Sequence, residues 1–170
     1  VDDIANINPR LYERQSQMTS SFGQLLGEEV LRVIEYTEIF KSNIQILSSD
    51  TVVTCPGRKR TNNDREGTAG VYIESDPVNI GLKLLVIGDI AICAMGGDPF
   101  SKIVIELKKE SPYNYTLMVV HANGMEGGYI PTDDSFGMNT FQVLGSKLQP
   151  GCAERAIING FLDLMYRVRN

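Results

Sequence analysis

The chain has 170 residues, of which 42% are hydrophobic and 22% are charged, and its formal net charge is −5. This length and composition are typical of about one globular domain that can bury a core. The acidic balance argues against a nucleic-acid partner, because phosphate binding needs a basic surface. The longest apolar run is interrupted by Lys83, Gly88 and Asp89, so we expect no transmembrane segment.

The first part of the chain predicts an arm, one helix and one strand. Residues 1–18 are polar without a period, which indicates an irregular arm. Thr19-Ser20-Ser21 can cap a helix, and apolar residues at helical spacing extend it to about Phe40. Residues 44–55 alternate in part and predict a strand that ends at Pro56.

The next segments predict a polar loop and two strands. Residues 57–67 are the most polar stretch of the chain and indicate a solvated loop. Residues 71–74 and 78–86 are strand candidates, with Asp76-Pro77 between them as a turn. Gly88-Asp89 predicts a tight hairpin connection into the following strand.

The fold is organised around residues 87–132. An apolar run ends at a Gly-Gly-Asp-Pro turn, an amphipathic segment follows, and a second apolar run leads into a glycine-rich loop. This order predicts a strand, a turn, a helix, a strand and a polar loop, which is typical of an α/β layer. The limits of these segments are residues 87–95, 96–99, 100–107, 115–122 and 123–132.

The last segments predict a short strand at residues 141–144 and a helix after Pro150-Gly151. In that helix, apolar residues from Ala153 to Val168 form one stripe. We therefore predict a single α/β domain over residues 1–170. It would have a mixed sheet, strand–turn–helix units packed by helices, and a closing C-terminal amphipathic helix.

The cysteines and the histidine limit the possible metal sites. Cys55, Cys93 and Cys152 are too few and too widely spaced to predict a disulfide scaffold or a zinc knuckle. Cys93 lies in an apolar run and is expected to be buried. The only histidine, His121, cannot build a His-rich zinc site within this chain. Its place at the end of an apolar strand favours a hydrogen-bonded core residue over a ligand.

Polar groups gather where the two central strands end. Asp98 can cap the following helix, or it can serve as a metal ligand or acid–base group, and both roles are compatible. The loop from Asn123 to Tyr129 is either a surface turn or part of a cleft, and Asp133 and Asp134 follow it. No phosphate loop, dinucleotide fingerprint or nucleophile elbow is present. Spacing alone therefore predicts an α/β domain with a polar cleft.

Four segments in order resemble the later part of the catalytic domain of the neutral/alkaline (non-lysosomal) ceramidase family. They are IGDIAICAMGGDPFSKI, LKKESPYNYTLMVVHANG, GYIPTDDSF and FQVLGSKLQPGCAERAI. The resemblance covers about residues 20–168 and is strongest over residues 87–155. It implies a zinc-dependent amidase that cleaves the N-acyl bond of ceramide, a lipid-like amide, and a secreted or periplasmic location.

The resemblance also implies roles for individual residues. Asp98 and Tyr129 stand where the family has metal ligands, a carboxylate and a tyrosine. Both are chemically suitable, since zinc accepts oxygen donors and can polarise an amide carbonyl. The residues expected to line the substrate cleft are Gly97, His121, Asn123, Gly124 and Phe141.

The chain departs from the family pattern at three points. Asp98 replaces a glutamate and is one methylene shorter, and Phe141 replaces a tyrosine that helps to hold the oxyanion. A phenyl ring cannot donate that hydrogen bond. The family's histidine ligands and active-site serine belong to an earlier half that this sequence lacks. We therefore expect half of an active site, with an N-terminal half or companion chain supplying the histidines. The alternative is a noncatalytic α/β binding or assembly module that lost the metal site.

Overall fold

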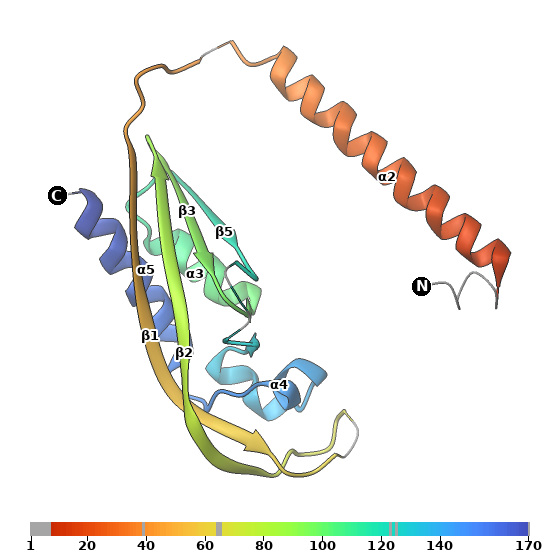
Figure 1. Ribbon diagram of the computed structural model, residues 1–170, viewed down its shortest axis with the longest axis vertical. Coiled ribbons are helices and arrows are strands. Elements are labelled where there is room, and N and C mark those ends of the chain that lie inside the picture. The colour runs from red at the N-terminus through yellow and green to blue at the C-terminus, as the bar shows by residue number, and fades with distance from the viewer. Residues whose placement is uncertain (1–7, 39, 64–65, 123, 125, 170) are drawn as a thin grey trace. The chain divides into compact units, whose positions relative to one another are not determined.

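The computed structural model describes residues 8–38, 40–63, 66–122, 124 and 126–169. The chain divides into two compact units, Val1–Asn43 and Ile44–Asn170. In chain order the elements are α2 (Pro9–Glu35), β1 (Ile46–Arg60), β2 (Tyr72–Ile87), β3 (Ile90–Met95), β4 (Asp98–Pro99), α3 (Ser101–Glu110), β5 (Tyr115–Val119), β6 (Tyr129–Ile130), η1 (Asp133–Met138), α4 (Phe141–Gly145) and α5 (Ala153–Arg169) (Figure 1).

The first unit contains the helix α2. The Asn8 side chain accepts a hydrogen bond from the Leu11 amide at 3.1 Å, and Pro9 occupies the start of the helix. Both are favoured helix-start residues. The predicted irregular arm is therefore wrong for residues 9–18, whereas residues 1–7 lie outside the described residues. None of the helices in the described part of the chain is long and apolar enough to cross a membrane.

The second unit is an α/β fold with a mixed sheet, as the sequence predicts. The sheet has the strand order β1-β2-β3-β5, in which β1, β2 and β3 are antiparallel neighbours. Strand β5 pairs parallel to β3, and helix α3 connects the two. The predicted hairpin turn is confirmed, since Ile87 pairs with Ile90 around Gly88, whose φ is +61°.

The hydrophobic core lies between one face of the sheet and the helices α3 and α5 (Figure 1). Alternate residues of β2 point into it, because successive side chains of a strand face opposite sides. The stripe predicted for the last helix is confirmed as its buried face. The buried residues of α5 are Ala153, Ile157, Ile158, Gly160, Phe161, Leu164 and Met165. These contacts fix the layer that carries the strand ends described below.

The strand boundaries around Pro56 differ from the prediction. Strand β1 continues through Pro56 to Arg60, and its register with β2 shifts between Cys55 and Gly57. Asp76-Pro77 lies opposite this bulge, so β2 also runs on without a turn. Proline lacks an amide hydrogen and is tolerated in strands at bulges. Both prolines therefore mark one bulge rather than two strand ends.

Three further predictions concern residues 141–144 and the cysteines. Residues 141–144 form the short helix α4 and not a strand. Cys55 and Cys152 form a disulfide, with their Cα atoms 5.8 Å apart, which the cysteine spacing did not predict. Cys93 is fully buried, as predicted. The disulfide attaches the start of α5 to β1 at the bulge.

Candidate functional site

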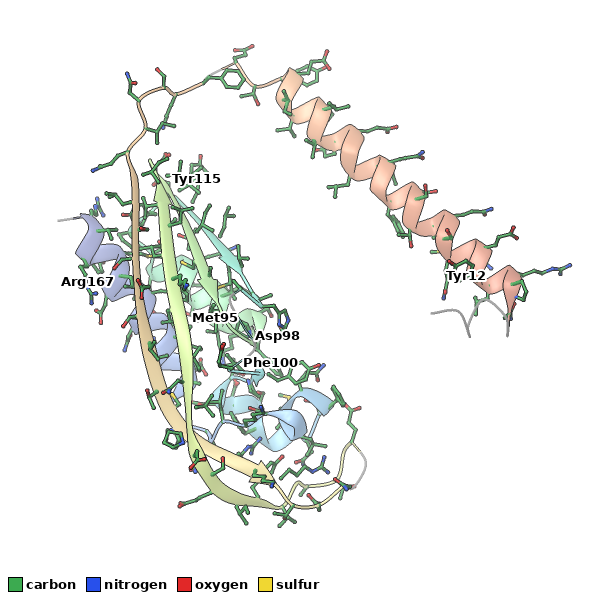
Figure 2. All side chains as sticks on the ribbon, in the orientation of Figure 1. Tyr12, Met95, Asp98, Phe100, Tyr115 and Arg167 are labelled. Atoms are coloured by element: carbon green, nitrogen blue, oxygen red, sulfur yellow. A yellow bond between two sulfur atoms is a disulfide. The ribbon has the colours of Figure 1, made fainter. Side chains whose placement is uncertain are left out.

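The turn that follows β3 places Asp98 at a strand-to-helix junction, as predicted (Figure 2). Gly97 has a φ of +97° and is buried against the glycine loop. A Cβ atom at Gly97 would lie 2.9 Å from the carbonyl oxygen of Gly128. Only glycine combines this backbone angle with so close an approach. Gly97 is therefore required to bring the two loops together.

Asp98 and Tyr129 lie side by side on neighbouring strands. Strands β4 and β6 are parallel, and Asp98 is paired directly with Tyr129. The Asp98 amide donates to the Gly128 carbonyl at 2.7 Å, and the Phe100 amide donates to the Ile130 carbonyl at 3.0 Å. Directly paired residues present their side chains on the same face of a sheet. The two oxygen-bearing side chains therefore face the same side.

Both residues line one hollow of about 440 Å³. Its wall also includes Lys102 from α3, together with Thr140 and Gln142 around the start of α4. The sequence analysis missed these three residues. Lys102 stands four positions after Asp98, a spacing that suggests proximity on a helix, but no sequence pattern links Asp98 to Thr140 or Gln142. With Ser101, the hollow therefore contains a carboxylate, a phenol, two hydroxyls, an amide and a cation.

Phe141 lies beside Tyr129 but does not line the hollow. Their rings meet edge to face, with centroids 5.8 Å apart and an interplanar angle of 73°. This arrangement is favourable for aromatic pairs. The Phe141 amide also donates to the Glu66 carboxylate at 3.0 Å, which holds the start of α4. Phe141 thus positions the Tyr129 ring but offers no side-chain hydrogen bond of its own.

None of the predicted cleft residues that the structure describes lines this hollow. The prediction that His121 is a core residue is wrong, since it is exposed, and its backbone has a φ of +56°. Its amide donates to the Gly97 carbonyl at 3.2 Å, so the residue links the two strand ends through its backbone. Gly124 lies beside Gly96 and Glu126 instead of beside Asp98. Asn123 lies outside the described residues.

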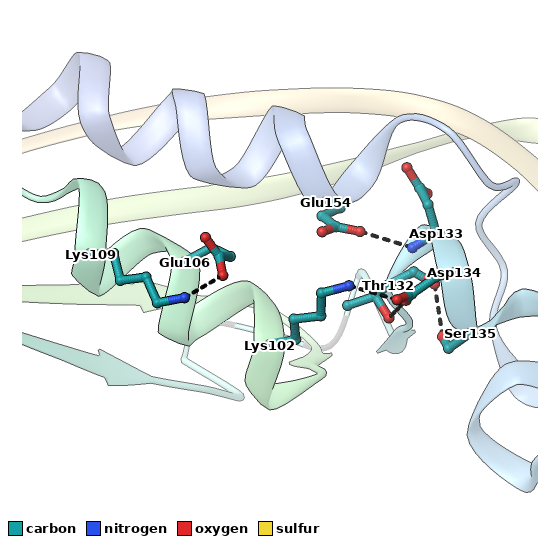
Figure 3. A network of polar contacts seen from close by, with 8 residues as sticks. All are labelled: Lys102, Glu106, Lys109, Thr132, Asp133, Asp134, Ser135 and Glu154. Carbon is teal, nitrogen blue, oxygen red and sulfur yellow. Dashed lines mark hydrogen bonds and ion pairs between the residues drawn. The ribbon is translucent and has the colours of Figure 1, made fainter.

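The carboxylate of Asp134 is engaged in an ion pair (Figure 3). The Lys102 ammonium group lies 2.6 Å from Asp134 Oδ2, and the Thr132 hydroxyl donates to Asp134 Oδ1 at 2.6 Å. The hydrogen bond from Lys102, followed by that from Thr132, lowers the pKa of Asp134 below its ordinary value. Asp134 therefore positions Lys102 at the edge of the hollow.

The carboxylate of Asp133 has a structural role. Asp133 Oδ1 accepts a hydrogen bond from the Gly151 amide at 2.7 Å, just before α5. In return, Glu154 Oε2 accepts one from the Asp133 amide at 2.9 Å (Figure 3). These bonds satisfy backbone donors near the start of α5, as capping groups do. Asp133 thus joins the segment after β6 to the final helix.

Among the described residues, the donors brought together at Asp98 are fewer than a catalytic zinc ion usually has. Within the described residues, no group of three or more His, Cys, Asp or Glu side chains could hold a metal. Catalytic zinc usually has three protein ligands and a water. Asp98 and Tyr129 would supply two oxygen donors, so a third ligand has to come from elsewhere. No hydrolytic step can be derived from this chain's residues alone.

Comparisons with known proteins add no further assignment. No protein-family model matches the chain, and searches of curated proteins and of solved structures gave no match either. The resemblance of the four segments to the ceramidase family therefore stays a prediction. The geometry around Asp98 and Tyr129 is the structural basis for discussing function.

Proposed function

We propose that this chain provides part of the active site of a ceramidase-like, zinc-dependent hydrolase that cleaves an N-acyl amide bond. Asp98 and Tyr129 are its metal-side residues, and Phe141 supports the Tyr129 ring. The substrate class is a lipid-like amide. The observation that carries the proposal is the direct pairing of Asp98 with Tyr129 on β4 and β6, within one hollow.

The pairing supports the proposal because it brings together two residues that are 31 positions apart in the sequence. A shared metal requires donor atoms on the same side of the fold, since direct zinc–oxygen bonds are about 2 Å long. Side chains of Asp98 and Tyr129 on opposite faces of the strands would have excluded a shared metal site. Zinc bound there would act as a Lewis acid and activate water. In this chain, Lys102 and Gln142 would contribute polar contacts at the edge of the hollow.

The proposal requires a companion polypeptide segment that supplies histidine ligands. The two donors of this chain fall short of the usual three, and His121 lies outside the hollow. The disulfide between Cys55 and Cys152 supports a secreted or periplasmic location, since disulfides persist in oxidising compartments.

A noncatalytic binding or assembly module is the second candidate. One observation favours it: Phe141 occupies the place next to Tyr129 where a hydrogen-bond donor would hold a developing oxyanion. In that case the strand ends would retain the fold without holding a metal. The two candidates differ in metal content, which makes them separable.

The test is a zinc and activity measurement on two preparations. The first is the purified 170-residue chain alone, loaded with zinc and dialysed. The second is the protein isolated from its source with any chain that co-purifies. Zinc is measured by elemental analysis, and activity by hydrolysis of a fluorogenic N-acyl amide and of ceramide. The Asp98→Asn and Tyr129→Phe variants of the second preparation are compared with the unmodified protein. Each variant changes only the group that would contact the metal.

We expect the lone chain to retain no stoichiometric zinc and to cleave neither substrate. The complex should contain zinc and should lose both metal and activity in the Asp98→Asn variant. Stoichiometric zinc with turnover in the lone chain would contradict the incomplete site. A complex without zinc or activity would instead support the noncatalytic module.

A further inference from the structure

A second hollow of about 470 Å³ lies on the other side of α4. Leu144 and Gly145 of α4 line it, whereas Thr140 and Gln142 face the Asp98 hollow. Its remaining walls come from the end of β1, from β2 beside the bulge, and from the segment that follows α4. This volume is within the range of small-molecule sites, about 300–1,000 Å³.

The residues that line this hollow are unusually basic for an acidic chain. Four of them are cationic, Arg58, Lys59, Arg60 and Lys147, and one is acidic, Asp76. The whole chain has only 16 Lys and Arg residues and a net charge of −5. Like charges gathered around a concave surface focus the potential and raise the local concentration of counter-ions. The basic hollow therefore attracts anions although the protein as a whole repels them.

Arg58 has a fixed position in this wall. Its guanidinium donates to the Val143 carbonyl at 2.6 Å and to the Ser146 carbonyl at 3.3 Å. It also stacks over the Tyr72 ring, 3.7 Å from the ring centroid. These contacts order the wall and the end of α4, and none of the ion pairs between described residues involves Arg58. The positive charge of Arg58 is thus held beside the hollow.

Lys147 is the group beside Arg58 that remains available for a ligand. Its side chain is exposed, and it forms no ion pair or hydrogen bond within the described residues. Gly57 and Leu148 form an antiparallel bridge, and the Arg58 amide donates to the Lys147 carbonyl at 2.7 Å, so Lys147 lies opposite Arg58 on the same face, whereas Lys59 faces the other side. Lysine ammonium groups bind carboxylate and phosphate as mobile point charges. The apolar residues Val78 and Leu144 line the same hollow.

We propose that this basic hollow binds an organic anion, a carboxylate or phosphate group on a short apolar body. Lys147 binds the anionic head, Arg58 beside it provides fixed positive charge, and Val78 and Leu144 contact the apolar body. The site uses neither Asp98 nor Tyr129. It therefore stands or fails independently of the proposed hydrolase.

Isothermal titration calorimetry of the full chain tests the proposal with four probes at low salt. They are octanoate, octyl phosphate, inorganic phosphate and the neutral 1-octanol. The test variant is Lys147→Gln. The matched control is Lys108→Gln on α3, which removes the same charge away from the hollow. Urea melts establish that both variants fold.

We expect octanoate or octyl phosphate to bind at one site and more tightly than 1-octanol. The test variant should weaken that binding roughly twofold to fivefold, as expected for one lost partly exposed ion pair, whereas the control variant should change it less than about 1.5-fold. Raising the salt concentration should weaken it as well, because salt screens exposed charges.

Three results would overturn the proposal. They are the absence of saturable anion binding, equal binding of 1-octanol, and an equal loss of affinity in the test and control variants. Inorganic phosphate that binds as tightly as octyl phosphate would overturn the part assigned to Val78 and Leu144.

Discussion

Replacing Leu164 by alanine tests whether α5 stabilises the sheet through its buried stripe. Leu164 is 0% exposed and belongs to the core that α5 forms with β1 and β2. The change removes three carbon atoms from the core. At about 0.8 kcal/mol for each buried carbon group, the lost transfer free energy is about 2.4 kcal/mol. The cavity left behind adds to this, so the total cost should be about 2 to 5 kcal/mol.

Urea unfolding followed by circular dichroism measures the effect. With an m value of about 2 kcal/mol per M, the midpoint should fall by about 1 to 2.5 M. Asp163→Ala is the matched control, because the neighbouring side chain is exposed on the same helix and should change stability by less than about 0.5 kcal/mol. Leu164→Met keeps the volume and should cost less than about 1.5 kcal/mol. Equal midpoints for Leu164→Ala and the unmodified chain would refute the packing of this stripe on the sheet.

Three further predictions concern the site and its surroundings. Gly97→Ala should lower the free energy of unfolding by about 2 kcal/mol or more, because alanine is strained at this φ and its Cβ would meet the Gly128 carbonyl. A thermal melt that matches that of the unmodified chain would contradict this prediction. Burial raises the pKa of the Cys93 thiol to about 12, so iodoacetamide should label it at neutral pH only after denaturation, as mass spectrometry would show. Lys102 lowers the pKa of Asp134, so this pair stabilises the fold above the ordinary carboxyl pKa, and the stabilisation is lost as the pH falls through the lowered value. In the Lys102→Met variant, NMR titration should show a higher pKa for Asp134. An unchanged pKa would argue against the pair.

The sequence predicts the elements whose signals are local. Apolar periodicity located α5, and the Gly-Gly-Asp-Pro turn located the junction at Asp98. The bulge was misread because Pro56 and Asp76-Pro77 each resemble a strand end when considered alone. Their meaning depends on the register between β1 and β2, which no local pattern shows.

The candidate site could be predicted only in part for the same reason. Family resemblance brought Asp98 and Tyr129 together, and the structure pairs them. Thr140 and Gln142 were missed because residues 141–144 were expected to form a strand, although they form α4. The apolar run before His121 predicts a core position for this residue. In the structure the backbone turns at His121 with a positive φ, and this turn exposes the side chain. Positions set by long-range pairing or by a backbone turn leave little signal in a single sequence.

The disulfide between Cys55 and Cys152 makes most of the α/β unit a covalent ring, because the two cysteines are 97 positions apart. Every strand end and both hollows lie on segments within or directly beside this ring. A protease that cuts the exposed connection between β1 and β2 at Gly67 would nick the ring without dividing the molecule. The nicked protein would run as one species on a non-reducing gel and as two fragments after reduction. Whether such a cut separates the two pieces would therefore depend on the redox state of the compartment.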